Sequence, residues 1–100
     1  MAMTFFSIEE SPIHKNMYII LPTSYFYSFI SSTKGSYHVY QARAFGLSYA
    51  NYLRMLRDEH KAVIYGKNQL YPAAFFKTKE DGAKILAELN RRFTKLVLRY

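Results

Sequence analysis

Residues 41–60 read QARAFGLSYANYLRMLRDEH, and this stretch contains the clearest local signals in the chain. Ser48 follows Gly46-Leu47 and precedes a helix-favouring run, with Tyr52 four positions into that run. This arrangement predicts a serine N-cap with a hydrophobic staple between Leu47 and Tyr52. We therefore expect a helix over residues 48–60. Its buried stripe is expected to contain Tyr49, Tyr52, Leu53, Leu56 and His60.

A neighbouring face of this helix carries cations. Arg54, Arg57 and Lys61 recur at i, i+3 and i+7, so we expect them to line one outward face over two turns. Asp58 stands four residues after Arg54 and is expected to pair with it.

A second helix is predicted to begin at Thr78, with Asp81 three residues later as a weak capping box. Glu88 and Arg92 have the favourable i, i+4 orientation on its outer face. Gly82 lies inside this helix, where glycine costs about 1 kcal/mol relative to alanine, and the sequence offers no reason for it. The expected buried stripe consists of Ile85, Leu86, Leu89 and Phe93.

The remaining segments predict strands. Residues 4–8 and 17–21 favour two strands around a turn, and residues 62–65 and 70–76 favour a hairpin around Gly66-Lys67-Asn68. Pro72 places the last of these at an edge or near a strand start. Residues 95–100 alternate as a half-buried strand does.

Residues 23–30 fit either a helix or a strand, and residues 37–45 are strand-like at their start and helix-like at their end. The chain is predicted to be one α+β domain, residues 1–100, with an antiparallel sheet and two or three helices packed on it.

Residues 41–76 also permit a helix-turn-helix or winged-helix interpretation. Ala42 and Gly46 provide the small residue and the turn glycine of such a motif. Asn51 and Arg54 would then face bases, and Lys67 at the hairpin tip would meet phosphate. The size of Tyr52 speaks against a tight helix pair. The simpler alternative is that Gly46 ends one element so that Ser48 can cap the next.

Charge is distributed unevenly along the chain. Residues 61–100 contain nine Lys or Arg and three acids, a net charge of +6, whereas residues 1–60 contain five and four, a net charge of +1. A basic surface attracts phosphates, acidic proteins or anionic lipid. We expect it to be built by the later hairpin, the last helix and the last strand, with Lys67, Lys77, Lys79, Arg91, Arg92 and Arg99 as its candidates. The predicted binding residues are Arg54, Arg57, Lys61, Lys67, Arg91 and Arg92.

Aromatic residues are concentrated in the first half, where residues 1–52 hold twelve of the eighteen Phe and Tyr. Eighteen is many for one small core, and tyrosine is enriched at protein interfaces. We therefore expect a homodimer or larger oligomer. The candidate interface residues are Tyr25, Tyr27, Tyr37 and Tyr40.

Several classes of chemistry find no support. The chain has no cysteine, which excludes disulfides and cysteine-based zinc sites. The glycines are too scattered for a phosphate-cradling loop, and the three histidines show no metal-ligand spacing. The acidic pairs are more simply explained as a turn, a helix end and a helix start. We expect no enzyme activity, metal or cofactor, no membrane association, and a soluble protein of the cytoplasm.

The run GLSYANYLRMLRDEH, followed by YGKNQLYPAAFFK and AELNRR, resembles small uncharacterised proteins encoded by phages and other mobile elements. The resemblance covers roughly residues 41–92. It implies a role in binding within a bacterial host cytoplasm, such as blocking a host defence protein or sequestering an anionic nucleotide signal.

Three hypotheses follow from the sequence. In the first, a small non-enzymatic protein binds an anionic partner, either a host defence protein or a nucleotide, to inhibit or sequester it. In the second, it binds nucleic acid through residues 41–76. In the third, it is a virion or assembly component, which predicts large homo-oligomers and no small ligand.

Overall fold

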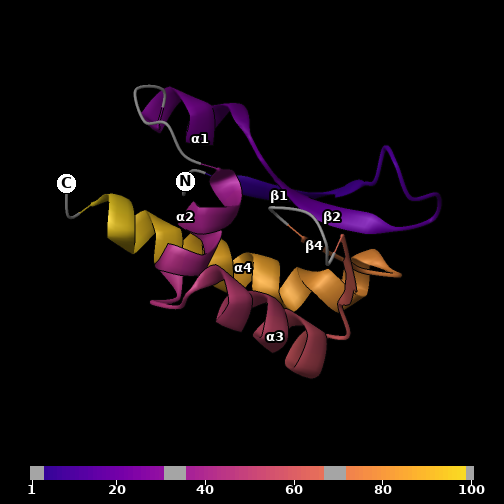
Figure 1. The fold of residues 1–100 in the computed structure, drawn as a ribbon. Coiled ribbons are helices and arrows are strands. Elements are labelled where there is room, and N and C mark those ends of the chain that lie inside the picture. Colours follow the sequence, from indigo (N-terminus) through magenta and orange to yellow (C-terminus); the bar gives the residue numbers. More distant parts are fainter. Residues whose placement is uncertain (1–3, 31–35, 67–71, 99–100) are drawn as a thin grey trace.

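The computed structural model describes residues 4–30, 36–66 and 72–98. Within these ranges the chain forms an α+β fold of four helices and two two-stranded antiparallel sheets. In chain order the elements are β1 (Phe6–Glu10), β2 (Tyr18–Pro22), α1 (Ser24–Phe29), α2 (Tyr37–Ala44), α3 (Tyr49–His60), β3 (Val63–Tyr65), β4 (Ala73–Phe75) and α4 (Lys79–Val97) (Figure 1).

Both predicted strand pairs are confirmed. β1 pairs with β2, and β3 pairs with β4, which begins directly after Pro72. The two sheets meet where Tyr18 and Phe76 exchange backbone hydrogen bonds of 2.8 and 2.7 Å. The turn predicted around Lys67 and Asn68 lies outside the described residues. The expected antiparallel pairing is thus divided between two small sheets.

The described residues of the segment left open between residues 23 and 46 form two helices. Thr23 occupies the N-cap of α1, but its hydroxyl donates to the Thr4 carbonyl oxygen at 2.6 Å instead of capping the helix. Ser36 caps α2, because its hydroxyl accepts from the His38 N–H at 3.2 Å. The strand interpretation of this segment was therefore wrong. The predicted cap at Ser48 is confirmed, since its hydroxyl accepts from the Asn51 N–H.

The strand predicted at residues 95–100 is also wrong. Helix α4 continues to Val97, and Leu98 is its C-cap. Leu96 and Val97 continue the helical stripe of Leu89 and Phe93 and pack against the same core. Residues 96–98 are three consecutive apolar residues, and such a short apolar run does not by itself distinguish a helix from a strand. Burial of the stripe against the core favours the helix. Arg99 lies outside the described residues.

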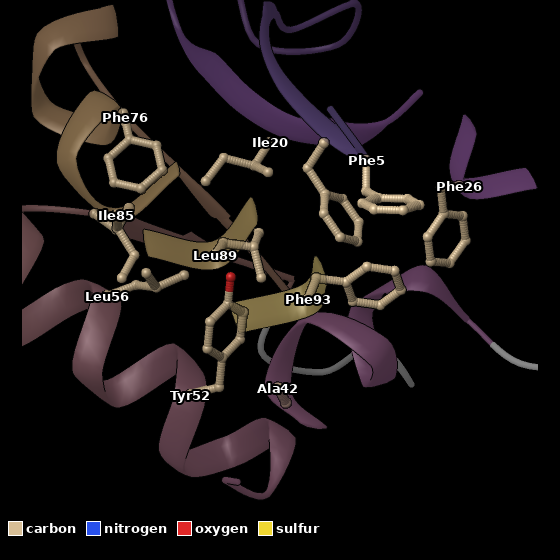
Figure 2. Close-up of a cluster of buried hydrophobic side chains, with 12 residues drawn as sticks. Phe5, Ile20, Phe26, Ala42, Tyr52, Leu56, Phe76, Ile85, Leu89 and Phe93 are labelled. Atoms are coloured by element: carbon tan, nitrogen blue, oxygen red, sulfur yellow. The ribbon is translucent and has the colours of Figure 1, made fainter. Parts of the chain in front are cut away.

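The core forms where α4 packs between the β1–β2 hairpin on one side and α3 on the other (Figure 1). Figure 2 shows side chains from the hairpin, α1, α3 and α4 converging on Leu89, which is fully buried. Phe5 and Phe93 meet there with ring centroids 4.9 Å apart, and Phe26 lies 5.7 Å from Phe93. Much of the aromatic excess is therefore used inside the protein.

A hydrogen-bond chain ties α3 to α2 and β2 through the core. The Tyr52 hydroxyl donates to Gln41 Oε1 at 3.0 Å, and Gln41 Nε2 donates to the Ile20 carbonyl oxygen at 3.4 Å. Tyr52 and Gln41 are both buried. The large tyrosine thus fits between α2 and α3, contrary to the expectation that its size would oppose a close helix pair.

We predict that Tyr52→Phe lowers the free energy of unfolding by about 1–2 kcal/mol, because Gln41 Oε1 stays buried without its donor. Urea unfolding followed by circular dichroism measures the change. The double variant with Gln41→Leu should recover part of the loss, since both polar partners are then removed. A Tyr52→Phe variant as stable as the parent protein would show that the bond contributes nothing.

Candidate functional site

Arg43 is positioned by the way α2 ends. Gly46 has a φ of +68°, its N–H donates to the Arg43 carbonyl oxygen at 2.9 Å, and the Leu47 N–H donates to the Ala42 carbonyl oxygen at 3.1 Å. These two bonds form a Schellman motif, which needs a left-handed residue at this position. Gly46 therefore ends α2 and allows Ser48 to begin α3, as the simpler interpretation of the sequence holds.

Three further cations are positioned by the burial of α4. Leu89 and Phe93 face the core, so Arg91, Arg92 and Lys95 project from the other side of the helix, where all three are exposed. The end of α2 lies against this half of α4 (Figure 1). Between the two helices is a surface cleft of about 390 Å³, which we call the basic cleft. It is lined by Arg43, Ala44, Phe45, Gly46, Arg91, Arg92, Lys95 and Leu96.

Glu88 forms ion pairs with two arginines of the basic cleft. Arg92 Nε lies 2.7 Å from Glu88 Oε1, and Arg91 forms a two-pronged pair with the same carboxylate. Hydrogen bonds from Arg91 and Arg92 lower the pKa of Glu88 from 4.5 to about 2. Within the described ranges, neither Arg43 nor Lys95 forms an ion pair. Among the described residues, four cations against one carboxylate leave a net charge of +3 at the cleft.

Aromatic rings support two of these arginines. The Arg92 guanidinium carbon lies 5.0 Å from the centroid of Phe45, and that of Arg43 lies 5.1 Å from the centroid of Tyr40. A guanidinium stacked on a ring keeps its N–H groups available at its edge, where they can donate in pairs to a phosphate or carboxylate. The cleft is thus suited to bind an anion.

A second cavity of about 310 Å³ adjoins the first, and we call it the apolar groove. It shares Arg43 and Leu96 with the basic cleft. The other lining residues are apolar or aromatic and come from α1, α2 and α4. They are Phe29, Ile30, Tyr40, Phe93 and Val97.

The other predicted arginines lie elsewhere. Arg54 and Arg57 are exposed on α3, as predicted, and line a cleft of about 390 Å³ beside β3 that shares no residue with the basic cleft. The predicted pair of Arg54 with Asp58 is not formed. Asp58 instead accepts from Arg57 at 2.8 Å, and Arg54 donates to Asn51 Oδ1 at 3.2 Å.

The sequence-predicted binding residues therefore do not form one site. Lys61 is exposed, but it adopts a left-handed conformation at the C-cap of α3 and so leaves the helical stripe of Arg54 and Arg57. Lys67 lies outside the described residues. Sequence analysis missed Arg43 and Lys95. Lys95 could have been found, since it stands four residues after Arg91 on the same helix face, whereas Arg43 joins the cleft only through the packing of α2 on α4.

The four tyrosines predicted at an interface fall into two groups. Tyr25 and Tyr27 project from α1 and are 53% and 56% exposed. Tyr37 and Tyr40 are half-buried and pack against the core. The side chains that remain available for an interface are therefore those of α1.

Acid–base and metal-binding groups are sparse in the described part of the chain. Burial lowers the pKa of His38 to about 4, so its imidazole is neutral at pH 7. No three His, Asp or Glu side chains of the described residues gather in a metal-binding arrangement. None of the helices found in residues 4–30, 36–66 and 72–98 is long and apolar enough to cross a membrane.

Comparison with known proteins adds no assignment: no protein-family model, curated protein or solved structure matches the chain. The candidate site therefore rests on the geometry of the basic cleft.

Proposed function

We propose that this chain is a non-enzymatic binding protein that holds a phosphorylated small ligand in the basic cleft and so sequesters it. The observation that supports this is the convergence of Arg43, Arg91, Arg92 and Lys95 from two helices on one cavity, where Glu88 is the one carboxylate of the described residues that pairs with them. The resemblance to small phage-encoded proteins fits a protein that removes a nucleotide signal from its host's cytoplasm.

The cleft favours a compact anion on physical grounds. Its volume of about 390 Å³ lies within the range of small-molecule sites. Arginine edges bind phosphate in a bidentate manner, and these bonds are stronger than those between neutral groups. Arg43 and Lys95 are not neutralised by a described acid, so an incoming anion need not displace a partner from them.

A second candidate function is nucleic-acid binding by α3. The four-residue connection from α2 and the exposure of Asn51 and Arg54 support it. Against it, the exposed face of α3 holds Asp58 and Glu59 beside its two arginines, so these four charges cancel. Because DNA affinity depends strongly on net positive charge, the basic cleft is the better-supported site.

Charge reversal tests the proposal. We predict that the double variant Arg91→Glu/Arg92→Glu weakens binding of inorganic pyrophosphate and adenosine 5′-triphosphate at least about tenfold, the effect of losing one charge-assisted contact. Isothermal titration calorimetry at low ionic strength measures it. Thermal stability should change little, because each exposed ion pair contributes about 1 kcal/mol or less.

The matched control is Lys77→Glu/Lys84→Glu, which changes the net charge equally but at exposed positions outside the cleft. It should retain most of the affinity. Equal losses of affinity for the probes in the two double variants would contradict a site localised at the basic cleft. The second candidate function replaces the first if neither probe binds the parent protein, a DNA duplex does bind, and Arg54→Ala lowers the affinity for that duplex.

A further inference from the structure

We infer that the ligand is a nucleoside phosphate, with its phosphate in the basic cleft and its base in the apolar groove. This inference rests on the proposed function and specifies the ligand of the same site. It begins from the fact that the two cavities are adjacent, since Arg43 and Leu96 line both. A ligand that fills both needs an anionic group joined to a group with apolar surfaces.

The groove has the character of a stacking site. Phe29 lines the groove and is 45% exposed, and Tyr40 lies under the Arg43 guanidinium. Aromatic rings and arginine planes are the surfaces on which nucleobases stack, whatever the base. Phe29 meets Phe5 edge-on, with ring centroids 6.4 Å apart, and a ligand that covered the rest of its ring would gain from burying apolar surface.

The open side of the groove favours a base over a hydrocarbon chain. Phe29 at 45% exposure and the exposed Arg43 show that water reaches the cavity along this edge. A hydrocarbon chain there would leave part of its surface in water, which is unfavourable. A nucleobase has apolar faces and polar edges, so it can bury a face while its edge stays hydrated.

The experiment compares adenosine 5′-monophosphate with ribose 5-phosphate by calorimetry at one ionic strength. The nucleotide should bind at least about fivefold more tightly, the lower end of what base stacking contributes. Phe29→Ala should remove most of that difference and leave binding of ribose 5-phosphate unchanged. The matched control is Tyr25→Ala, an exposed aromatic of the same helix that does not line the groove, and it should leave both affinities unchanged.

Each other outcome has a distinct meaning. Equal binding of the two phosphates, with no effect of Phe29→Ala, overturns the base site and leaves the proposed function standing. Binding of neither phosphate overturns the nucleoside assignment, and it overturns the proposed function as well if pyrophosphate and adenosine 5′-triphosphate also fail to bind. An octyl phosphate that binds more tightly than the nucleotide, and that weakens with Phe29→Ala, overturns the nucleoside assignment in favour of a hydrocarbon group.

Discussion

Gly82→Val is expected to lower the free energy of unfolding by about 3 kcal/mol, because a larger side chain overpacks the close contact of α4 with Ile8 of β1 and with Phe76. A Cβ atom at position 82 would lie 2.6 Å from Ile8 Cδ1 and 3.0 Å from Phe76 Cδ2. Phe76 is almost fully buried and cannot move away. For a protein of this size the loss corresponds to a fall in Tm on the order of 15 °C, which differential scanning calorimetry measures.

Gly82→Ala should be much milder. Its methyl group meets the terminal methyl of Ile8, a half-buried side chain that can rotate, and the Phe76 ring at 3.0 and 3.2 Å, which a shift of a few tenths of an ångström relieves. Alanine also gains about 1 kcal/mol of helix propensity, and it lacks the two further methyl groups that valine would add to this contact. Ile8→Val removes that terminal methyl, so the pair Ile8→Val/Gly82→Ala should be more stable than the two separate effects predict. If Gly82→Val unfolds at the same temperature as the parent, α4 does not approach β1 as closely as described.

Asn90→Ala is expected to cost about 3 kcal/mol, since it removes the side chain that holds β1 on α4. Asn90 Oδ1 accepts from the N–H groups of Phe5 and Phe6 at 3.1 and 2.9 Å, and Nδ2 donates to the Phe6 carbonyl oxygen at 3.0 Å. One amide thus serves three backbone groups, as a neighbouring strand would. Urea unfolding measures the loss.

Two variants check the interpretation of Asn90. Asn90→Asp keeps the oxygen that accepts from the N–H groups of Phe5 and Phe6, but it replaces the amide donor to the Phe6 carbonyl oxygen with a second acceptor. At neutral pH its stability should therefore fall between those of the parent and Asn90→Ala. Asn51→Ala removes an exposed asparagine that accepts one bond from Arg54, and it should change stability by less than about 0.5 kcal/mol. Similar effects at positions 51 and 90 would show that the link to β1 contributes little.

Helix α4 contributes to the stability of the fold with one side and to the candidate site with the other. Its inner side carries Gly82, Leu89 and Phe93, which fix its distance from the sheet and from α3. Its outer side carries Arg91 and Arg92, which line the basic cleft. Variants of the inner side should therefore lower the free energy of unfolding, whereas variants of the outer side should weaken ligand binding with little loss of stability.

The sequence by itself determined the features that depend on neighbours along the chain. The caps at Ser48 and Thr78, the helix after each of them, the Glu88–Arg92 pair and the two strand pairings were all readable, because each depends on residues a few positions apart. Arg91 and Arg92 were also identified as one outward basic group for this reason.

Only the tertiary structure decided how those elements combine. Residues 95–97 fit two periods, and burial against the core made them helical. Gly82 was unexplained until β1 and Phe76 were found against α4. Arg43 lies about fifty residues from Arg92 in sequence, and it reaches the basic cleft because α2 packs on α4. Local rules carry no information about such distant contacts, since these depend on which apolar faces bury one another.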